Sequence, residues 1–243
     1  MKIATWNLES AHRLTPSRKA AFLDAMRKVD ADVWVLTETW VDFSLKPDHR
    51  LVAQSRWADD LKPDQCWVAI WARESLQTTP LDIESQPDRM ACGRIEQPGQ
   101  SDLVVVGTVL PWPNDKQWPG ATGFCEALDL QAGEWKQLRG TPETCTLVVA
   151  GDFNQSVPYV RYYGSTKGAT ALLDTLTTQG LFCLTPGNDP LTDTPRIDHV
   201  CISRSGLRPP FLPRIGAWEV PCVGEKPITD HAGVSADLPL VIV

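Results

Sequence analysis

Seven polar side chains stand where short apolar segments of this chain are interrupted or end. They are Asn7, Glu38, Asp152, Asn154, Asp198, Asp230 and His231. Carboxylate and amide oxygens are hard ligands that suit Mg²⁺ or Mn²⁺, and the sequence offers no Cys/His cluster for Zn²⁺. Because a rigid scaffold can aim side chains at strand ends toward a common point, the set is a candidate metal-assisted catalytic site.

Each of these residues also has an ordinary structural interpretation. Asn7 could stand in a turn, Glu38 at a solvated strand end, and the stretch 151–154 in an Asx-type turn. His231 on its own would more often be a partly buried, hydrogen-bonded histidine than a catalyst. Single motifs of this kind arise often by chance, so the functional interpretation depends on the whole combination and its order.

The elements that must position these residues are mostly strands. Runs rich in β-branched or aromatic residues, bounded by turn signals, predict strands at 2–8, 33–36, 67–71, 103–110, 145–150, 197–202 and 233–238. Helices are predicted at 16–29, after the N-cap Thr15, at 170–180, before a glycine stop, and more weakly at 124–139. The region 50–110 lacks strict β-α alternation, so two mixed sheets with helices outside suit this order better than a doubly wound sheet.

Taken together and in order, the motifs resemble those of the endonuclease/exonuclease/phosphatase superfamily. That family carries W-N, then E, then G-D-F-N, then R-I-D, then S/T-D-H, and all of these occur here between residues 6 and 231. The resemblance spans nearly the whole chain. It implies an α/β fold, a four-layer α/β/β/α sandwich of two mixed β-sheets flanked by helices, in a single domain 1–243 with its site at the top of the two sheets.

The resemblance implies a metal centre that binds Mg²⁺ or Mn²⁺. Glu38 would be the main metal ligand, with Asp230 and Asn7 close by. Glu9 takes the place of a supporting acid that often follows the W-N motif.

The same resemblance implies the catalytic roles. Asp152 would orient or deprotonate the attacking water, and Asn154 would hold the phosphate or that water. Asp198 would hydrogen-bond His231 and favour its protonated form near the phosphate. The sequence leaves open whether His231 acts as a base or as a phosphate-binding cation.

One position departs from the family pattern. Family members usually place a His or Tyr just before the V/L-P step, where it touches the scissile phosphate, and here that position is Val109. A metal-bound water could then protonate the leaving group, or Arg161 or Lys167 could hold the phosphate. A solvated surface role is the simpler explanation for both basic residues, so the departure leaves the substrate open.

The composition fits a folded enzyme without a generally basic surface for binding nucleic acid. Of the 243 residues 42 % are hydrophobic, which is enough for a substantial core, and the formal net charge is −7. An acidic balance disfavours a long contact with duplex DNA and favours a small or single-stranded substrate. It does not exclude a nuclease, because metal-binding carboxylates count as negative charge until the cation arrives.

Cysteine usage and the N-terminus predict a cytoplasmic protein. The seven cysteines show no CxxC pair and no regular spacing, which is typical of reduced, mostly buried thiols. The first residues enter a predicted strand at once, with no signal-peptide pattern. No apolar run approaches the roughly 20 residues that span a bilayer, so no membrane segment is expected.

Two further features concern aromatic residues and a second histidine. Trp112 and Trp118 follow a strand that should point at the site and could stack on a base or sugar. They could equally fill the core or cover a hydrophobic seam, which is the more frequent role. His199, next to Asp198, should point to the opposite face of its strand and be packed rather than catalytic.

Three functions remain open from the sequence. The leading one is Mg²⁺- or Mn²⁺-dependent hydrolysis of phosphodiester bonds by attack of water at phosphorus, as a nuclease with nucleic acid as substrate. The second is hydrolysis of a small phosphate ester or a lipid headgroup. The third is a catalytically inactive family member that binds a partner through the cleft that holds the active site in other members. The sequence identifies no protein partner, no number of metals and no oligomeric state.

Overall fold

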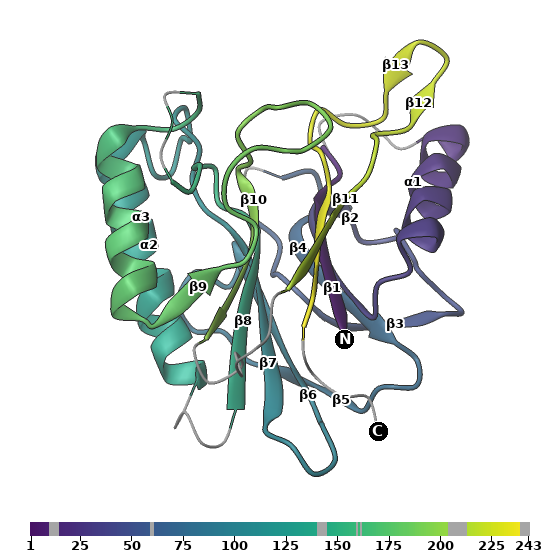
Figure 1. Cartoon of the computed structure of the whole chain (residues 1–243), viewed down its shortest axis with the longest axis horizontal. Helices are drawn as coiled ribbons and strands as arrows, with labels where there is room; N and C mark the ends of the chain where they lie inside the picture. The colour runs from purple at the N-terminus through teal and green to yellow at the C-terminus, as the bar shows by residue number, and fades with distance from the viewer. Residues whose placement is uncertain are drawn as a thin grey trace.

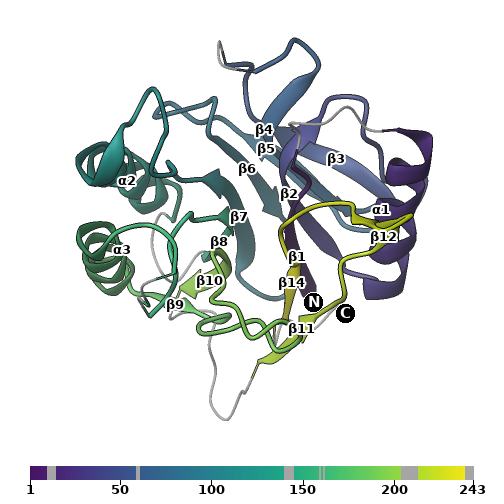
Figure 2. The same cartoon turned by 90° about the horizontal axis from the view of Figure 1, so that it is seen from above.

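A computed structural model of the chain describes residues 1–9, 15–58, 61–139, 145–158, 160, 162–203 and 213–238. Two six-stranded sheets lie face to face in this part of the chain, with helices on both outer faces (Figure 1). Seen from above, the order is a helical layer, two sheets and a second helical layer (Figure 2). The predicted four-layer α/β/β/α sandwich is therefore confirmed.

The first sheet has the strand order β11-β14-β1-β2-β4-β3. Its strands are β1 (Lys2–Asn7), β2 (Val33–Trp40), β3 (His49–Gln54), β4 (Gln65–Arg73), β11 (Arg214–Ala217) and β14 (Val234–Asp237). β1 is parallel to β2 and antiparallel to β14, so the sheet is mixed and the first strand of the chain lies near its centre.

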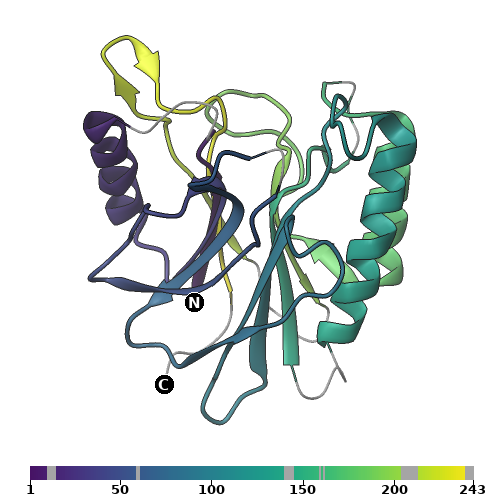
Figure 3. The ribbon, with the colours of Figure 1, turned by 180° about the vertical axis from the view of Figure 1, so that it is seen from behind.

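The second sheet has the strand order β5-β6-β7-β8-β10-β9. Its strands are β5 (Thr78–Leu81), β6 (Met90–Ile95), β7 (Asp102–Val109), β8 (Cys145–Asp152), β9 (Leu181–Cys183) and β10 (Asp198–Ser203). β8 runs parallel to β7 and antiparallel to β10. A separate two-stranded ribbon, β12 (Cys222–Val223) with β13 (Lys226–Pro227), lies beside the helix of the first sheet (Figure 3).

Helices α1 and α3 begin where the sequence supplies caps. α1 (Pro16–Val29) follows Thr15, whose hydroxyl accepts the Arg18 N–H at 3.3 Å. α3 (Thr166–Thr178) follows Ser165, whose hydroxyl accepts the Gly168 N–H at 3.0 Å. α2 (Gly120–Arg139) packs beside α3 on the second sheet. The predicted helix 16–29 is confirmed at both ends, whereas α2 and α3 each begin four residues before the predicted start.

Three apolar layers hold the sandwich together. The central layer lies between the sheets and contains Val35, Val68, Val105 and Val148 among others. The outer layers lie between the first sheet and α1, and between the second sheet and α2 with α3. Both faces of each sheet are covered, which explains why the central strands are apolar throughout rather than alternating.

Two further observations bear on the expectations about location. All seven cysteines lie within the described residues and none forms a disulfide. Among the described helices, none has the length and apolar character needed to cross a membrane.

Candidate active site

Asn7 joins the two sheets at the end of β1. Trp6 packs toward α1, so the next side chain along the strand faces the space between the sheets. The buried amide Nδ2 of Asn7 donates hydrogen bonds to Glu38 Oε1 and to Asp152 Oδ2, each at 3.0 Å. Its Oδ1 accepts the backbone N–H of Glu9 at 2.8 Å. One carboxylate from each sheet is thus held by a single amide.

Glu38 reaches this point through an irregularity in β2. Trp34 and Leu36 pack toward α1, and regular alternation would turn Glu38 the same way. Instead its φ is +45°, a left-handed conformation that is uncommon for glutamate, and its carboxylate meets Asn7. The strand continues through this residue to Trp40, so Glu38 does not end it as the sequence suggested.

Asp152 is the last residue of β8 and faces the same space. Its Oδ1 accepts the backbone N–H of Asn154 at 2.8 Å, which closes the Asx-type turn that the sequence allowed. Asn154 also has a positive φ, +49°. Its Nδ2 donates to the carbonyl of Leu110 at 2.8 Å, so this side chain fixes the loop that follows β7.

Asp198 and His231 form a direct pair. Asp198 begins β10 and lies opposite Asp152 in the strand register, so the two carboxylates are neighbours. His231 Nδ1 lies 2.6 Å from Asp198 Oδ2, and the histidine side chain is 15 % exposed. The ring therefore presents Nε2 toward the open side of the site. His199, by contrast, is fully buried, as predicted, with Nε2 3.0 Å from the Gln155 carbonyl oxygen.

The first and last motifs of the sequence are bonded to each other. The indole Nε1 of Trp6 donates to the His231 carbonyl at 2.9 Å. The Thr229 hydroxyl donates to the Asn7 carbonyl at 3.0 Å and accepts the His231 N–H at 3.2 Å. The W-N and T-D-H motifs thus fix the position of the loop that carries the histidine.

Asp230 is placed differently from the other residues. Its side chain is 75 % exposed, and its Oδ1 lies 3.7 Å from His231 Nε2. Within the described residues, no hydrogen bond or ion pair joins it to Asn7 or Glu38. The structure brings two bonded groups, Asn7 with Glu38 and Asp152, and Asp198 with His231, into one cluster, and Asp230 stands at its edge.

Burial and mutual repulsion shift the titration of this cluster. Burial raises the pKa of Glu38, although the hydrogen bond from Asn7 opposes the shift. Burial, and then the charge of Asp198, raise the pKa of Asp152 to about 7. Burial alone would lower the pKa of His231, but the adjacent Asp198 carboxylate holds it well above the ordinary value. Crowded, poorly solvated carboxylates of this kind favour a bound cation.

Comparison with known proteins decides the family. The model of the Endonuclease/Exonuclease/phosphatase family matches residues 4–231. The chain belongs to this family. The match runs from the first strand to His231 and so includes every residue of the cluster.

Solved structures of Endonuclease/Exonuclease/phosphatase proteins share the fold. The endonuclease domain of TRAS1, a telomere-specific non-LTR retrotransposon, is 19 % identical with a TM-score of 0.68, and 98 % of each chain is covered. The AP endonuclease LMAP from Leishmania major is 13 % identical with a TM-score of 0.70, covering 97 % of this chain and 86 % of that one. The 3' phosphatase NExo from Neisseria, bound to product DNA hairpin, is 16 % identical with a TM-score of 0.67, covering 98 % and 99 %. Among curated proteins, none matches the chain in sequence.

The residues present fit a divalent cation, as the metal-dependent chemistry of this family requires. Ligand atoms of Asp152, Asp198 and His231 all lie within 4.8 Å of one another. Asp198 Oδ1 is buried without a hydrogen-bond partner in the described structure. The Glu38 carboxylate adjoins this group through Asn7. This grouping differs from the predicted ligand set of Asn7, Glu38 and Asp230, which stays a prediction.

Val109, where Endonuclease/Exonuclease/phosphatase proteins usually carry His or Tyr, packs in the core. It is 1 % exposed and lies opposite Asp152 in the register of β7 and β8. Its neighbours in the layer between the sheets include Trp67 and the partly buried Trp112. The position is therefore filled by apolar and aromatic packing instead of a polar phosphate contact.

The basic residues suggested as substitutes do not supply that contact. Lys167 is on α3, and its Nζ donates to Thr122 Oγ1 at 3.2 Å. This bond ties α3 to α2 and leaves the ammonium group outside the cluster. Arg161 lies outside the described residues.

Tyr163 is a neighbour of the cluster that the sequence did not single out. It lines a hollow together with Asp198, Asp230 and His231. Burial is the main reason that the pKa of its phenol is raised to about 12. The nearby charge of Asp152 is the next largest cause. The sequence around Tyr163 contains no recognisable motif. An aromatic residue before a glycine is too common a pattern to indicate a site.

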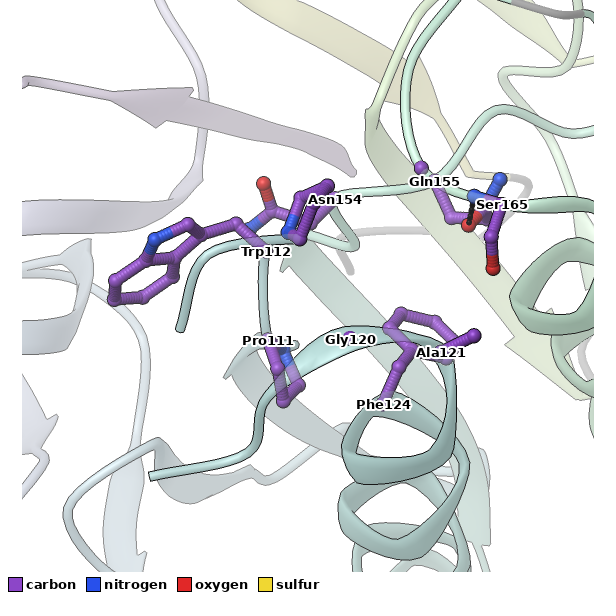
Figure 4. A pocket seen from close by; sticks show the side chains of 10 residues that line it. Pro111, Trp112, Gly120, Ala121, Phe124, Asn154, Gln155 and Ser165 are labelled. Carbon is purple, nitrogen blue, oxygen red and sulfur yellow. Dashed lines mark hydrogen bonds between the residues drawn. The ribbon is translucent and has the colours of Figure 1, made fainter. Parts of the chain in front are cut away.

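The loop that carries Tyr163 is held by Gln155. The Gln155 side chain donates to the Tyr163 carbonyl at 3.3 Å and accepts the Ser165 N–H at 3.1 Å. The second of these bonds is visible in Figure 4. Between them Gly164 has a φ of +82°, and a Cβ there would come within 2.2 Å of Gln155. A glycine is needed at this position for the loop to close on the glutamine.

Proposed function

We propose that the protein hydrolyses phosphodiester bonds of nucleic acid and requires Mg²⁺ or Mn²⁺. The observation that carries the proposal is the bonded cluster, in which Asn7 holds Glu38 and Asp152 together beside the Asp198–His231 pair. The residues come from both sheets and from distant parts of the sequence, yet their polar atoms converge on one point. Such convergence is expected of a catalytic centre and is not needed for folding.

The cation would be held by the carboxylates of this cluster, with Glu38 as the main ligand. Asp230 is available at the open edge, and Asn7 fixes the position of Glu38 from behind. When bound, the cation would supply charge neutralisation at a phosphoryl oxygen and at the leaving oxygen.

Asp152 is the group that we assign to the attacking water. Its two oxygens are fixed by the N–H of Asn154 and the amide of Asn7, so its remaining lone pairs have a defined direction. A pKa raised to about 7 makes its carboxylate oxygen a better proton acceptor near neutrality than an ordinary aspartate.

His231 is assigned to the phosphate. Because Asp198 keeps the imidazole in its charged form, Nε2 carries a proton that it can donate as a hydrogen bond to a phosphoryl oxygen. Asp198 thereby positions the ring and stabilises its charge. In this assignment the histidine acts as a phosphate-binding cation.

Nucleic acid is the proposed substrate class because the similar structures act on it. Several of them are endonucleases or were solved with DNA products, such as TDP2 from D. rerio with single-strand DNA product. The polar contact missing at Val109 leaves small phosphate esters as the main alternative outcome. We also propose that the chain forms one domain, 1–243, and, from its unpaired thiols, that it is cytoplasmic.

The proposal is tested by assaying the purified protein with Mn²⁺ on a panel of substrates. The panel comprises plasmid DNA, single-stranded DNA, RNA, a nucleotide monophosphate and a chromogenic diester. Cleavage of the polymers, abolished by a chelator and by Glu38→Gln, is the expected result. Cleavage of the small esters alone would replace nucleic acid by a small ester as substrate. Undiminished turnover in excess chelator would rule out the metal-dependent mechanism.

A further inference from the structure

Trp112 is attached directly to the catalytic segment. It stands two residues after Leu110, whose N–H donates to the Asp152 carbonyl at 2.9 Å. The Leu110 carbonyl in turn accepts the Asn154 side chain at 2.8 Å. The backbone that carries Trp112 is therefore tied to Asp152 and Asn154, and Trp112 and Asn154 line one pocket.

The indole contacts a buried tryptophan and a buried arginine. The Trp67 and Trp112 ring centroids are 5.4 Å apart, and the Arg89 guanidinium lies 4.3 Å from the first and 5.0 Å from the second. Arg89 forms an ion pair with Asp115 at 3.0 Å, and both side chains are 1 % exposed.

Asp115 also shapes the loop that carries the indole. Its backbone N–H donates to the Trp112 carbonyl at 3.0 Å, and its Oδ1 accepts the N–H groups of Gln117 and Trp118 at 2.9 and 3.1 Å. A side chain braced in this way loses little further freedom when a ligand packs against it.

Trp112 is partly exposed, whereas its aromatic neighbour Trp67 is 6 % exposed. Trp112 and Asn154 line a small pocket, with Pro111 and Phe124 also in its wall (Figure 4). The indole projects away from Phe124 in this view.

The position of this surface relative to the cluster is fixed by strand order. Trp112 follows β7, while Asp198 begins β10, and β8 with Asp152 lies between them. A phosphate bound between Asp152 and His231 would therefore have Trp112 on the side away from the histidine. That is where the nucleotide next to the scissile bond would lie.

We propose that Trp112 is a stacking platform for the base of the nucleotide next to the scissile phosphate, so that the protein prefers single-stranded or unpaired nucleic acid. The inference rests on the proposed nuclease function and names its substrate class. Paired bases are stacked on their own neighbours and cannot lie on an indole. With a net charge of −7, stacking also supplies affinity that phosphate contacts provide in basic nucleases.

The test compares two single strands of equal length and backbone, one with bases and one built of base-free sugar units. In Mn²⁺, Trp112→Leu should raise KM for the base-bearing strand about 10-fold and leave kcat nearly unchanged. It should leave cleavage of the base-free strand unchanged, and Trp112→Phe should retain most of the affinity. Phe182→Leu, an exposed aromatic at the far edge of the second sheet, is the matched control.

The outcomes separate this inference from the function on which it rests. If Trp112→Leu alters both strands equally, or neither, the indole is structural and the stacking proposal is overturned. If the parent protein cleaves plasmid DNA but neither cleaves nor binds single strands, measured by fluorescence anisotropy of a labelled strand, the stacking proposal alone is overturned; if it acts on none of the polymers, both proposals fail. Thermal unfolding of each variant establishes that a changed KM comes from a folded protein.

Discussion

Glu38 and Asn154 have the same unusual backbone, with φ angles of +45° and +49°. Asparagine adopts this left-handed conformation readily, but glutamate does so with a strain of about 1 kcal/mol. The conformation turns the Glu38 carboxylate away from α1 and toward Asn7. Strain at this residue is the local cost of aiming a carboxylate at the site.

Replacing Glu38 with Asn should therefore separate stability from activity. Asn tolerates the conformation and removes a buried carboxylate, so the metal-free protein should gain about 1 kcal/mol in free energy of unfolding. Turnover should fall at least about 100-fold, because the main metal ligand is lost. Urea unfolding in chelator and turnover in Mn²⁺ measure the two effects. Glu84→Asn, at an exposed position with ordinary φ, should change neither the free energy of unfolding nor the turnover. A less stable Glu38→Asn protein would contradict the strain argument.

The proposed roles of His231 and Asp152 predict large losses from single changes. His231→Ala removes the charged phosphate contact, and Asp152→Asn removes the proton acceptor. Each should lower kcat/KM at least about 100-fold while circular dichroism shows an intact fold. Near-normal rates for both variants would place the chemistry elsewhere in the molecule.

At the scale of elements, the Thr229 hydroxyl and the Trp6 indole bind the loop before β14 to β1. Thr229 is 1 % exposed, and its Oγ1 donates to the Asn7 carbonyl and accepts the His231 N–H. The histidine therefore depends on the first strand for its position, although the two are far apart in sequence.

Thr229→Val should release this loop with little change in volume. The Asn7 carbonyl and the His231 N–H would both lose a buried partner, which should lower the free energy of unfolding by about 1–3 kcal/mol. Activity should fall more steeply than stability alone would cause, because His231 shifts relative to Asp198. Unfolding and turnover of the same preparation measure both, with Thr177→Val on α3 as an exposed control. Parent-like activity in Thr229→Val would show that the loop is held by other contacts.

Sequence patterns predicted the central elements better than the peripheral ones. α1 was located at both ends because Thr15 and Pro16 form an unambiguous start. α2 begins at Gly120, four residues before the prediction, because its Gly-Ala-Thr-Gly start has weak helical propensity. β3 and β5 are short edge strands with polar residues or proline, so neither shows a strand pattern.

For the candidate site, the motifs identified the residues but not their bonds. The order W-N, E, G-D-F-N, R-I-D, T-D-H gives no indication that Trp6 bonds the His231 carbonyl, since 225 positions separate them. The turn of Glu38 out of the regular pleat is likewise set by its partner Asn7, not by neighbouring sequence. The sequence did not predict Tyr163 as a site residue, because only the folded loop brings it into the hollow that Asp198 also lines.

At the scale of the whole molecule, the site is divided between two sheets that must stay in register. Glu38 belongs to the first sheet and Asp152 to the second, and the sheets approach closely at Gly107, where a Cβ would lie 2.4 Å from Val68. The carboxylates are thereby brought together in poorly solvated surroundings. Without a cation, their mutual repulsion destabilises the folded state.

The metal-free protein should consequently lose stability as the pH rises. The folded pKa of Asp152 is about 7, above its unfolded value of about 3.9, so its contribution is present at low pH and is lost up to about pH 7. The pKa of His231 is also raised, so its contribution is present below about pH 6.5 and is lost at higher pH. Urea unfolding in chelator between pH 5 and 8 measures this fall.

Saturating Mn²⁺ should reverse the trend, because the cation competes with protons for the same carboxylates and stabilises the folded state. Asp152→Asn should flatten the metal-free profile between pH 5 and 7. A metal-free protein whose stability rises over this range would show that the carboxylates are not strained by one another.

The pairing of β1 with β14 also sets the order of events during synthesis. Lys2 lies opposite Asp237, and Asn7 acquires its partner Thr229 only from the far end of the described chain. An emerging polypeptide therefore holds Glu38 and Asp152 long before the histidine loop exists. The proposed active site is therefore assembled only after the chain has been made as far as β14, the last described strand.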